Sequence, residues 1–231
     1  VGPNDNVGDV INSGTLSIGF IGLAEALVAL IGKHHGESME AQELGLKIVG
    51  AIRKVCDEYK EKYKLNYSCL ATPAEGLSGR FTVLDRKEFG IIPGITDREY
   101  YTNSSHVPVY YPIPAYKKIH IESQYHRLEN AGHIVYVEMD AEAKKNIPAF
   151  MKLIREMYLS DAGYGAINHP VDRCLKCGHE GAIDDACPVC GETEAIDKIR
   201  RITGYLVGTL DRWNSFKKAE EKDRVKHTIC D

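Results

Sequence analysis

The sequence predicts an α/β protein with a small metal-bound segment near its C-terminus. Segments with the alternating pattern of strands and segments with the apolar spacing of helices follow one another along the chain. The connections between them are long enough for neighbouring strands to run parallel. Four of the seven cysteines lie within seventeen residues, much closer together than the cysteines of a disulfide framework. These observations predict a hydrophobic body followed by a segment that a metal holds together.

Length and composition exclude several classes of protein. The 231 residues suffice for one domain, or for one domain with a small appendage. Apolar residues make up 43% and charged residues 27%, which excludes a disordered or fibrous chain. A net charge of −4 offers no basic surface for nucleic acid. The most apolar stretch, residues 15–32, contains Glu25 and three glycines, so no membrane span is expected.

The start of the chain and its cysteines indicate where the protein resides. The first residues have no basic region followed by an apolar run, so we expect no secretion signal. Clustered cysteines that bind a metal fit the reducing cytoplasm. The first residue is Val1 and not Met, which predicts a fragment or a processed chain.

The first half of the chain is expected to contain two strands joined by helices. Residues 15–20 alternate as in a strand, and residues 21–31 have apolar side chains at helical spacing. Ser38 is a suitable helix start, and this helix should extend to about Tyr63. Residues 67–71 are expected to form a buried strand. An amphipathic segment should then continue to about Phe89.

The second half should complete the body and then change character. Residues 90–114, rich in Pro, Tyr, Asn and Ser, are expected to form an ordered loop. A strand is predicted at 132–139 and a helix at 141–158. From Gly163 to Glu194 the chain has too few large apolar residues for a core. We therefore divide the chain into units 1–162, 163–194 and 195–231. A solvated helix is expected within residues 217–226, because charges of both signs alternate there.

Two Cys-x2-Cys pairs, separated by nine residues, carry the metal prediction: Cys174, Cys177, Cys187 and Cys190. Two residues between cysteines let one turn direct both sulfurs at one ion. A glycine follows each pair, and glycine permits the positive φ that turns backbone N–H groups toward sulfur. Four thiolates complete a tetrahedral Zn²⁺ site with no open position, which predicts a structural role. Iron in the same site, or two redox-active disulfides, are the alternatives.

Several stretches of the chain match one enzyme family. Residues 201–205, Arg-Ile-Thr-Gly-Tyr, resemble the glycyl radical signature Arg-x-x-Gly-Tyr, with Gly204 fourteen residues after Cys190. Taken alone, this short motif also fits a plain turn glycine. With the cysteines and the other stretches, in the same order, the chain resembles the anaerobic (class III) ribonucleoside-triphosphate reductases over nearly its whole length. The other stretches are Asn-Ser-Gly-Thr-Leu-Ser-Ile-Gly at 12–19, Ala-Thr-Pro-Ala-Glu-Gly at 71–76, Tyr-Thr-Asn-Ser at 101–104, Ala-Ile-Asn-His-Pro at 166–170 and Arg-Val-Lys-His at 224–227.

This resemblance implies a fold and an activity. The fold would be the C-terminal part of a glycyl-radical-enzyme α/β barrel, followed by a small four-cysteine zinc ribbon and a radical loop. The activity would be anaerobic reduction of ribonucleoside triphosphates to 2′-deoxyribonucleoside triphosphates, with formate or a thiol as reductant. Gly204 would store the radical, which a separate 4Fe-4S, S-adenosylmethionine-dependent activase installs. A homodimer of the full-length enzyme is also implied, and the zinc knot would position the radical loop.

The cysteine that forms the thiyl radical in this family is expected upstream of Val1. Cys56 lies on the apolar face of a predicted helix and Cys69 lies in a predicted strand, so both are expected in the core. The chain is therefore expected to be the C-terminal part of a longer reductase and to be inactive alone.

Two further residues are candidates for the active site. The resemblance places Asn12 near the substrate and, in formate-using members, near formate; a turn or cap residue is an equally good interpretation. Glu75 follows the end of a predicted strand, where α/β sites gather. The resemblance implies that it handles the 2′-hydroxyl proton, and burial would raise its pKa toward that use. A glutamate at a helix N-terminus is the alternative.

Two other functions compete with the reductase. The chain could be a stand-alone radical-domain piece that replaces an oxygen-cleaved C-terminus, or a non-enzymatic zinc-ribbon binding module in which Gly204 is a plain turn. Four acidic residues around the cysteines oppose contact with nucleic acid. The histidines and the tyrosine pairs are expected to be structural.

Overall fold

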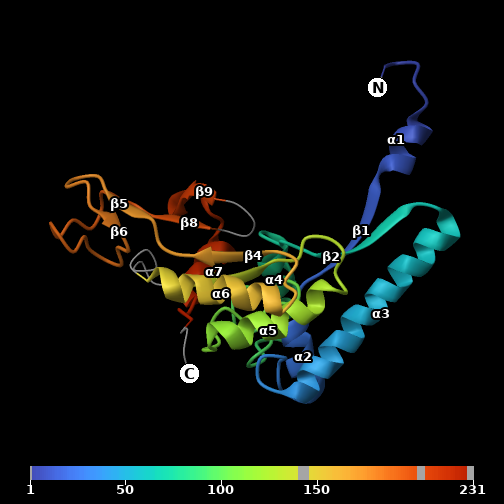
Figure 1. Ribbon diagram of the computed structural model, residues 1–231, viewed down its shortest axis with the longest axis horizontal. Coiled ribbons are helices and arrows are strands. Elements are labelled where there is room, and N and C mark those ends of the chain that lie inside the picture. Colours follow the sequence, from blue (N-terminus) through green and yellow to red (C-terminus); the bar gives the residue numbers. More distant parts are fainter. Residues whose placement is uncertain (1, 140–145, 202–205, 228–231) are drawn as a thin grey trace.

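The structure is a computed structural model that describes residues 2–139, 146–201 and 206–227. Two pairs of parallel strands form the centre of the body, with helices packed around them (Figure 1). β1 (Thr15–Phe20) pairs with β2 (Asn66–Ala71), and β3 (Val135–Glu138) pairs with β4 (Gly165–Asn168). The mixed α/β class and the parallel pairing predicted from the sequence are therefore confirmed.

The described strands do not close a barrel. An isolated parallel bridge between Leu70 and Ala131 connects β2 to the segment before β3. Beyond this bridge, the described strands form four separate sheets of two or three strands each. The structure thus supports the α/β class, and the barrel implied by the family resemblance is present only as open parallel pairs.

Local signals fix the two helices between β1 and β2. α2 (Leu23–Ile31) begins two residues later than predicted, because Gly22 is left-handed with φ 75°. It ends at Gly32, which is also left-handed. α3 (Met39–Tyr63) begins where predicted, since the Ser38 side chain accepts a hydrogen bond from the backbone N–H of Ala41 at 3.1 Å.

The next segments also agree with prediction. α4 (Leu77–Phe89) is the expected amphipathic segment. Residues 90–114 form no helix or strand apart from an isolated bridge between Ile21 and Asn103, so the expected loop is confirmed. Hydrogen bonds tie this loop to the helices beside it, such as that from Tyr101 Oη to Asp85 on α4 at 2.7 Å.

Two helices were not predicted, and two elements are shorter than predicted. α1 (Val7–Ser13) precedes β1, and α5 (Ala115–His126) follows the long loop. β3 begins only at Val135, because Gly132 has φ 72° and interrupts the extended chain. α6 (Ile147–Leu159) begins after Asn146, whose side chain accepts from Ala149 N; residues 140–145 of the predicted helix lie outside the described part of the chain.

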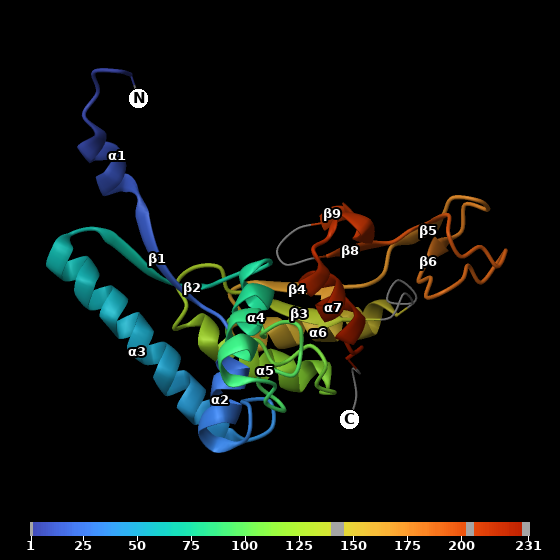
Figure 2. The same ribbon diagram turned by 180° about the vertical axis from the view of Figure 1, so that it is seen from behind.

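The C-terminal part consists of small antiparallel sheets. β4, the first strand after Gly163, still pairs with β3, so the sheet of the body continues past the change in composition. The elements that follow are β5 (Asp172–Cys174), β6 (Glu180–Gly181), β7 (Ile196–Asp197), β8 (Ile199–Arg201), β9 (Leu206–Thr209), the 3-10 helix η2 (Leu210–Arg212) and α7 (Ser215–Asp223). β5 pairs with both β6 and β7, and β8 pairs with β9. The β8–β9 pair lies between the cysteine-containing end and the body in both views (Figures 1 and 2).

The prediction that α7 is a solvated helix was wrong. Lys217 and Glu220 are buried and form an ion pair with each other. α7 also packs closely on α4, because a Cβ atom at Gly79 would come within 1.9 Å of the Phe216 ring. Two of the charged side chains of this helix are thus paired inside the protein, whereas Lys218 and Lys222 are exposed.

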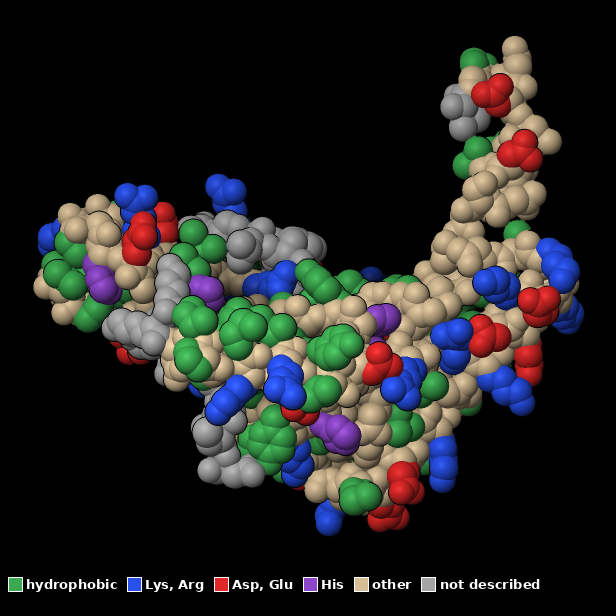
Figure 3. Space-filling view, viewed as in Figure 1, with side chains coloured by type: hydrophobic (Ala, Val, Ile, Leu, Met, Phe, Trp, Pro, Cys, Tyr) green, Lys and Arg blue, Asp and Glu red, His purple; other side chains and the backbone are tan. Residues whose placement is uncertain are grey.

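Hydrophobic clusters hold the body together. One cluster joins α2, α3 and β2 and contains both Cys56 and Cys69, which confirms the prediction that these cysteines belong to the core. Burial raises the pKa of the Cys69 thiol to about 11, so this side chain stays neutral. A second cluster joins α5, α6 and β3. The outer face of α6 exposes further apolar side chains, which gather on the face seen in Figure 3: Ile147, Met151, Ile154, Tyr158 and Leu159.

Candidate metal centre and adjoining cavity

The four clustered cysteines lie on two similar turns. In the first turn, Gly178 N donates to Cys174 O at 2.9 Å; in the second, Gly191 N donates to Cys187 O at the same distance. Gly178 has φ 76° and Gly191 has φ 74°, which confirms that both positions use the left-handed conformation expected of glycine. Cys174 and Cys187 are buried, whereas the second cysteine of each pair is exposed.

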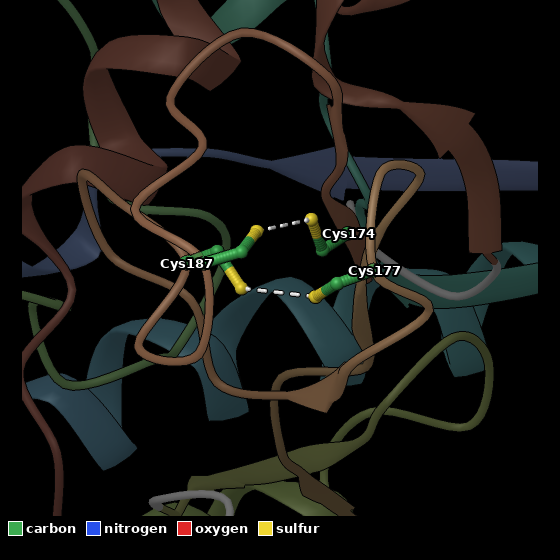
Figure 4. A group of neighbouring side chains, drawn as sticks. Cys174, Cys177 and Cys187 are labelled. Atoms are coloured by element: carbon green, nitrogen blue, oxygen red, sulfur yellow. Dashed lines mark hydrogen bonds between the residues drawn. The ribbon is translucent and has the colours of Figure 1, made fainter.

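The sulfur atoms converge from the two turns (Figure 4). Cys174 Sγ lies 3.6 Å from Cys190 Sγ, and Cys177 Sγ lies 3.6 Å from Cys187 Sγ. All four sulfurs lie within 4.8 Å of one another. A tetrahedral Zn²⁺ with bonds of about 2.3 Å requires sulfurs about 3.8 Å apart. The donor set and its spacing therefore fit Zn²⁺, and the six described cysteines are free thiols and not disulfides.

The acid–base properties of these thiols also favour a cation between them. A hydrogen bond with the backbone of Glu192 lowers the pKa of Cys190, but desolvation and the neighbouring sulfurs together raise this pKa to about 12. For Cys187, desolvation is outweighed by hydrogen bonds from backbone N–H groups of Cys190 and Val189, which lower its pKa to about 6. Four thiolates this close repel one another, so all four ionise together only when a metal ion neutralises them.

Little else holds the cysteine-containing segment together. We call residues 170–197 the knot. Its apolar core consists of Ile183 with two of the cysteines, and Ile196 packs against them. The carboxylate of Glu192 accepts hydrogen bonds from the backbone N–H groups of three following residues and pairs with Lys176 at 3.3 Å. Side chains of both charge signs lie over the knot on the face seen in Figure 3.

Gly204, the predicted radical residue, lies outside the described residues, as does Tyr205. The structure does describe both flanks. They are strands β8 and β9, which pair antiparallel with Arg201 opposite Leu206. The guanidinium of Arg201 lies 5.5 Å from the centre of the Tyr136 ring on β3. The first residue of the Arg-x-x-Gly-Tyr motif is therefore anchored beside the central sheet of the body.

Tyr136 also lines a cavity at the carboxyl ends of the parallel strands. Such ends are where α/β proteins usually place ligands. The cavity is lined by parts of four of the stretches that resemble the reductase family, although these are far apart in the sequence. The lining residues from these stretches are Ala71, Thr72, Pro73, Thr102, Asn103, Ser104, Asn168, Arg224 and His227. Sequence reasoning identified the stretches but did not predict that they would meet in one place.

Buried charges stabilise one wall of this cavity. Lys118 and Glu122, four residues apart on α5, form a buried ion pair, and Glu122 Oε2 lies 3.2 Å from His106 Nδ1. Although burial opposes ionisation, Lys118 and His106 hold the pKa of Glu122 well below its usual range. This wall thus carries a permanently ionised carboxylate whose charge is balanced.

Another part of the lining brings the C-terminal segment onto the end of β3. Glu138 N donates to His227 Nδ1 at 2.8 Å, and Asn168 Nδ2 donates to Glu138 Oε1 at 2.9 Å. Burial, together with the charge of Lys118, lowers the pKa of His227 to about 4. His227 is therefore neutral at physiological pH and acts as a hydrogen-bond acceptor. No described histidine lies within the group of residues that could hold a metal ion.

The sequence also offered two candidate active-site residues, Asn12 and Glu75. Asn12 is on the exposed helix α1, which projects from the body (Figure 1), and not in a turn. Glu75 is half-buried and stands two residues before α4, and its backbone carbonyl accepts a hydrogen bond from Asn214 Nδ2 at 3.4 Å. Neither residue is among the described lining of the cavity. Glu75 is nevertheless close in sequence to Pro73, which does line the cavity.

The fold and the cysteine cluster define the class: a mixed α/β protein with four cysteines in its C-terminal part that could hold a metal ion. Comparison with known proteins defines the family. The family model for anaerobic ribonucleoside-triphosphate reductase matches residues 2–227, and the chain belongs to this family. The resemblance inferred from the sequence is thereby confirmed.

Individual relatives agree with this assignment. The anaerobic ribonucleoside-triphosphate reductase of Escherichia coli (strain K12) is 37% identical over 238 residues, covering 97% of this chain and 33% of that protein. The protein of the same name from Salmonella typhimurium (strain LT2) is 36% identical over 236 residues, with the same coverage. The chain thus spans about a third of these relatives.

A solved structure supports the fold independently. An anaerobic ribonucleotide reductase superposes with a TM-score of 0.75 over 94% of this chain and 35% of that chain, at 21% sequence identity. At this identity the match concerns the fold alone. Among the described helices, none combines the length and the apolar character needed to cross a membrane.

Proposed function

We propose that the chain is the radical-bearing part of an anaerobic reductase that converts ribonucleoside triphosphates to 2′-deoxyribonucleoside triphosphates. The observation that carries this proposal is family membership across residues 2–227, including the knot and both strands that flank Gly204. The remaining two thirds of such an enzyme would supply the thiyl cysteine. Cys56 and Cys69 are buried in the core of the body and do not suit that role.

Gly204 would store the radical. A radical on a glycine Cα is favoured because the residue has no side chain, so the backbone can become planar and the unpaired electron spreads onto both flanking amides. A radical S-adenosylmethionine activase with a 4Fe-4S cluster would remove the hydrogen atom. Formate or a thiol would serve as reductant, and the full-length enzyme would be a homodimer in the cytoplasm.

The knot would bind a structural Zn²⁺ through Cys174, Cys177, Cys187 and Cys190. Four sulfur ligands leave no position for substrate, so the ion would supply folding free energy and no catalytic chemistry. We retain the division into a body (1–162) that belongs to the catalytic barrel, a zinc unit (163–194) and a radical unit (195–231). The pairing of β4 with β3 suggests that the body contributes one more strand beyond 162.

Glu75 and Asn12 remain candidate active-site residues. Glu75 follows β2, whose carboxyl end borders the cavity, and a proton-handling role at the 2′-hydroxyl would require the substrate to reach that end. Asn12 precedes β1, on an exposed helix that another part of the enzyme would have to cover.

Electron paramagnetic resonance of the full-length enzyme tests the proposal. After anaerobic activation with activase, S-adenosylmethionine and reductant, we expect a doublet in the unmodified enzyme and none in Gly204→Ala. Gly50→Ala is a matched control, because Gly50 lies in α3 and a Cβ atom there has open space around it. This control should give the full signal.

Zinc content and activase competence are measured in the same samples. An unmodified enzyme that is loaded with zinc and gives no doublet with a competent activase would overturn the proposed radical role. A doublet that persists in Gly204→Ala would place the radical on another residue.

A further inference from the structure

Arg200, the neighbour of the Arg-x-x-Gly-Tyr motif, is joined to the knot by a buried ion pair. Its guanidinium binds the carboxylate of Asp172 through two nitrogens, with Nη2 donating to Oδ2 at 2.8 Å and Nη1 donating to Oδ1. Asp172 is fully buried and the Arg200 side chain is 14% exposed. A bidentate pair of this kind fixes orientation as well as distance.

Asp172 is itself an integral part of the knot. It begins β5, the strand that ends at the first cysteine ligand, Cys174. Its Oδ2 also accepts a hydrogen bond from the backbone N–H of Ile183 at 2.8 Å, and Ile183 is the apolar centre of the knot. Any rearrangement of the cysteine turns would therefore displace the carboxylate that holds Arg200.

The other side of Arg200 is attached to α7. Arg200 Nε donates to Glu221 Oε1 at 3.2 Å. The next residue along β8, Arg201, is held from the same direction, because Arg224 Nη1 donates to its backbone carbonyl at 2.8 Å. Arg224 is fixed in turn by Glu220, at 2.9 Å. The last two described residues before Gly204 are thus fixed by α7 and the segment that follows it.

We propose that Arg200 is a positioning residue that couples the metal state of the knot to the placement of the segment containing Gly204. This inference rests on the proposed function only for the role of the segment that contains Gly204. The Asp172–Arg200–Glu221 connection joins β5, β8 and α7 through one guanidinium. Metal binding orders Asp172, Asp172 orients Arg200, and Arg200 fixes the strand that leads into the segment.

Hydrogen–deuterium exchange in the full-length enzyme measures this coupling without any radical chemistry. Exchange of residues 199–209 is recorded with zinc bound and after chelation, in the unmodified enzyme, in Arg200→Lys and in Arg173→Lys. Lysine keeps the charge but cannot form the bidentate pair. Arg173 is the matched control, because it lies beside Asp172 on β5, is 61% exposed and approaches Glu180 only to 4.0 Å.

In the unmodified enzyme and in Arg173→Lys, we expect zinc removal to speed exchange in residues 199–209 by about tenfold, the usual size of a coupling between two sites. In Arg200→Lys, zinc removal should change that exchange by less than about twofold, because the connection is already cut. An equal response in all three proteins, or no response in the unmodified enzyme, would overturn the proposal.

Two further measurements make the result independent of incomplete folding and of the proposed function. If Arg200→Lys does not retain zinc, Glu221→Gln replaces it, since this variant leaves the Asp172–Arg200 pair intact and should lose only the part of the coupling that reaches α7. The glycyl radical yield per chain is measured separately and should fall in Arg200→Lys at unchanged zinc content. A radical that persists in Gly204→Ala would refute the proposed function, and the exchange data would still decide the role of Arg200.

Discussion

The body and the knot are stabilised in different ways. The body buries clusters of large apolar side chains between parallel strands and helices, and two of its cysteines are ordinary members of that core. The knot has Ile183 at its centre and relies on four converging sulfurs. Burial of apolar surface is distributed over many contacts, whereas a metal site concentrates the folding free energy in one ion. The two regions should therefore respond very differently to the loss of single groups.

Loss of the metal should have the largest effect. In the full-length protein, Cys187→Ser or chelation should unfold residues 170–197, because structural Zn²⁺ supplies about 10–16 kcal/mol in comparable small sites. Hydrogen exchange should become fast throughout the knot and stay slow in β2 and α3. Cys56→Ala is the control: it removes a buried thiol from the body and should leave zinc content unchanged. A knot that keeps slow exchange without metal would contradict this description.

The next effect concerns a buried charge in the body. Lys118→Ala should destabilise α5 by about 3–5 kcal/mol, because it removes the cation that is paired with the buried carboxylate of Glu122. Arg127→Ala breaks an ion pair with Asp161 whose two side chains are 72% and 67% exposed, and it should cost about 0–1 kcal/mol. Opening free energies from native-state hydrogen exchange compare the two. Equal costs would show that the Lys118–Glu122 pair is as well solvated as the surface pair.

A purely apolar truncation should have a somewhat smaller effect. Leu27 on α2 is fully buried, so Leu27→Ala should cost about 3 kcal/mol through lost contacts and a cavity. Leu30 on the same helix is 63% exposed, and Leu30→Ala should change stability by less than about 0.5 kcal/mol. Neither variant should alter zinc content. The distinction between the regions fails if Leu27→Ala releases the metal.

The smallest effect is a pH dependence of the body. Burial raises the pKa of Glu129 to about 7, although a hydrogen bond from Ser105 opposes this rise. Between pH 4.5 and 7 the folded protein keeps a proton that the unfolded chain has lost. The contribution of Glu129 to stability is therefore present below pH 4.5 and is lost as pH rises through 7.

Glu129→Gln mimics the protonated form and tests this contribution. Relative to the unmodified protein, the variant should gain local stability progressively as the pH rises from 4.5 to 7, with no further gain above that range. Exchange rates of β3 and α5, compared at matched pH, provide the measurement. A difference that does not depend on pH would mean that Glu129 titrates normally.

Local sequence signals predicted several elements accurately. The strand at residues 15–20 and the helix that begins after Ser38 were placed correctly, because alternation and a capping serine act within a few residues. α5 was missed for a physical reason. It buries Lys118 and Glu122 among its apolar side chains, so its sequence lacks the continuous apolar face by which a surface helix is recognised.

The burial of α7 and the position of the cavity could not be predicted from the sequence either. Lys217 and Glu220 are typical of a solvated helix. They are interior because Glu220 pairs with both Lys217 and Arg224, and because Phe216 packs on Gly79. The cavity lining comes from stretches spread over more than a hundred residues, so the sequence alone could not show that they meet.

The sequence by itself determined the chemistry that depends on residues close together in the chain. The two Cys-x2-Cys pairs, each followed by a glycine, specify two turns that bring four sulfurs together, because every required contact lies within seventeen residues. The motif around Gly204 is likewise local, and the family assignment follows from such stretches. Only the tertiary structure decided that Asp172 holds Arg200, that Arg224 holds Arg201, and that charged side chains of α5 and α7 are buried. Asp172 and Arg200, like Arg201 and Arg224, lie far apart in the sequence. The charged pairs of α5 and α7 are local, but they are buried only because other segments pack over these helices.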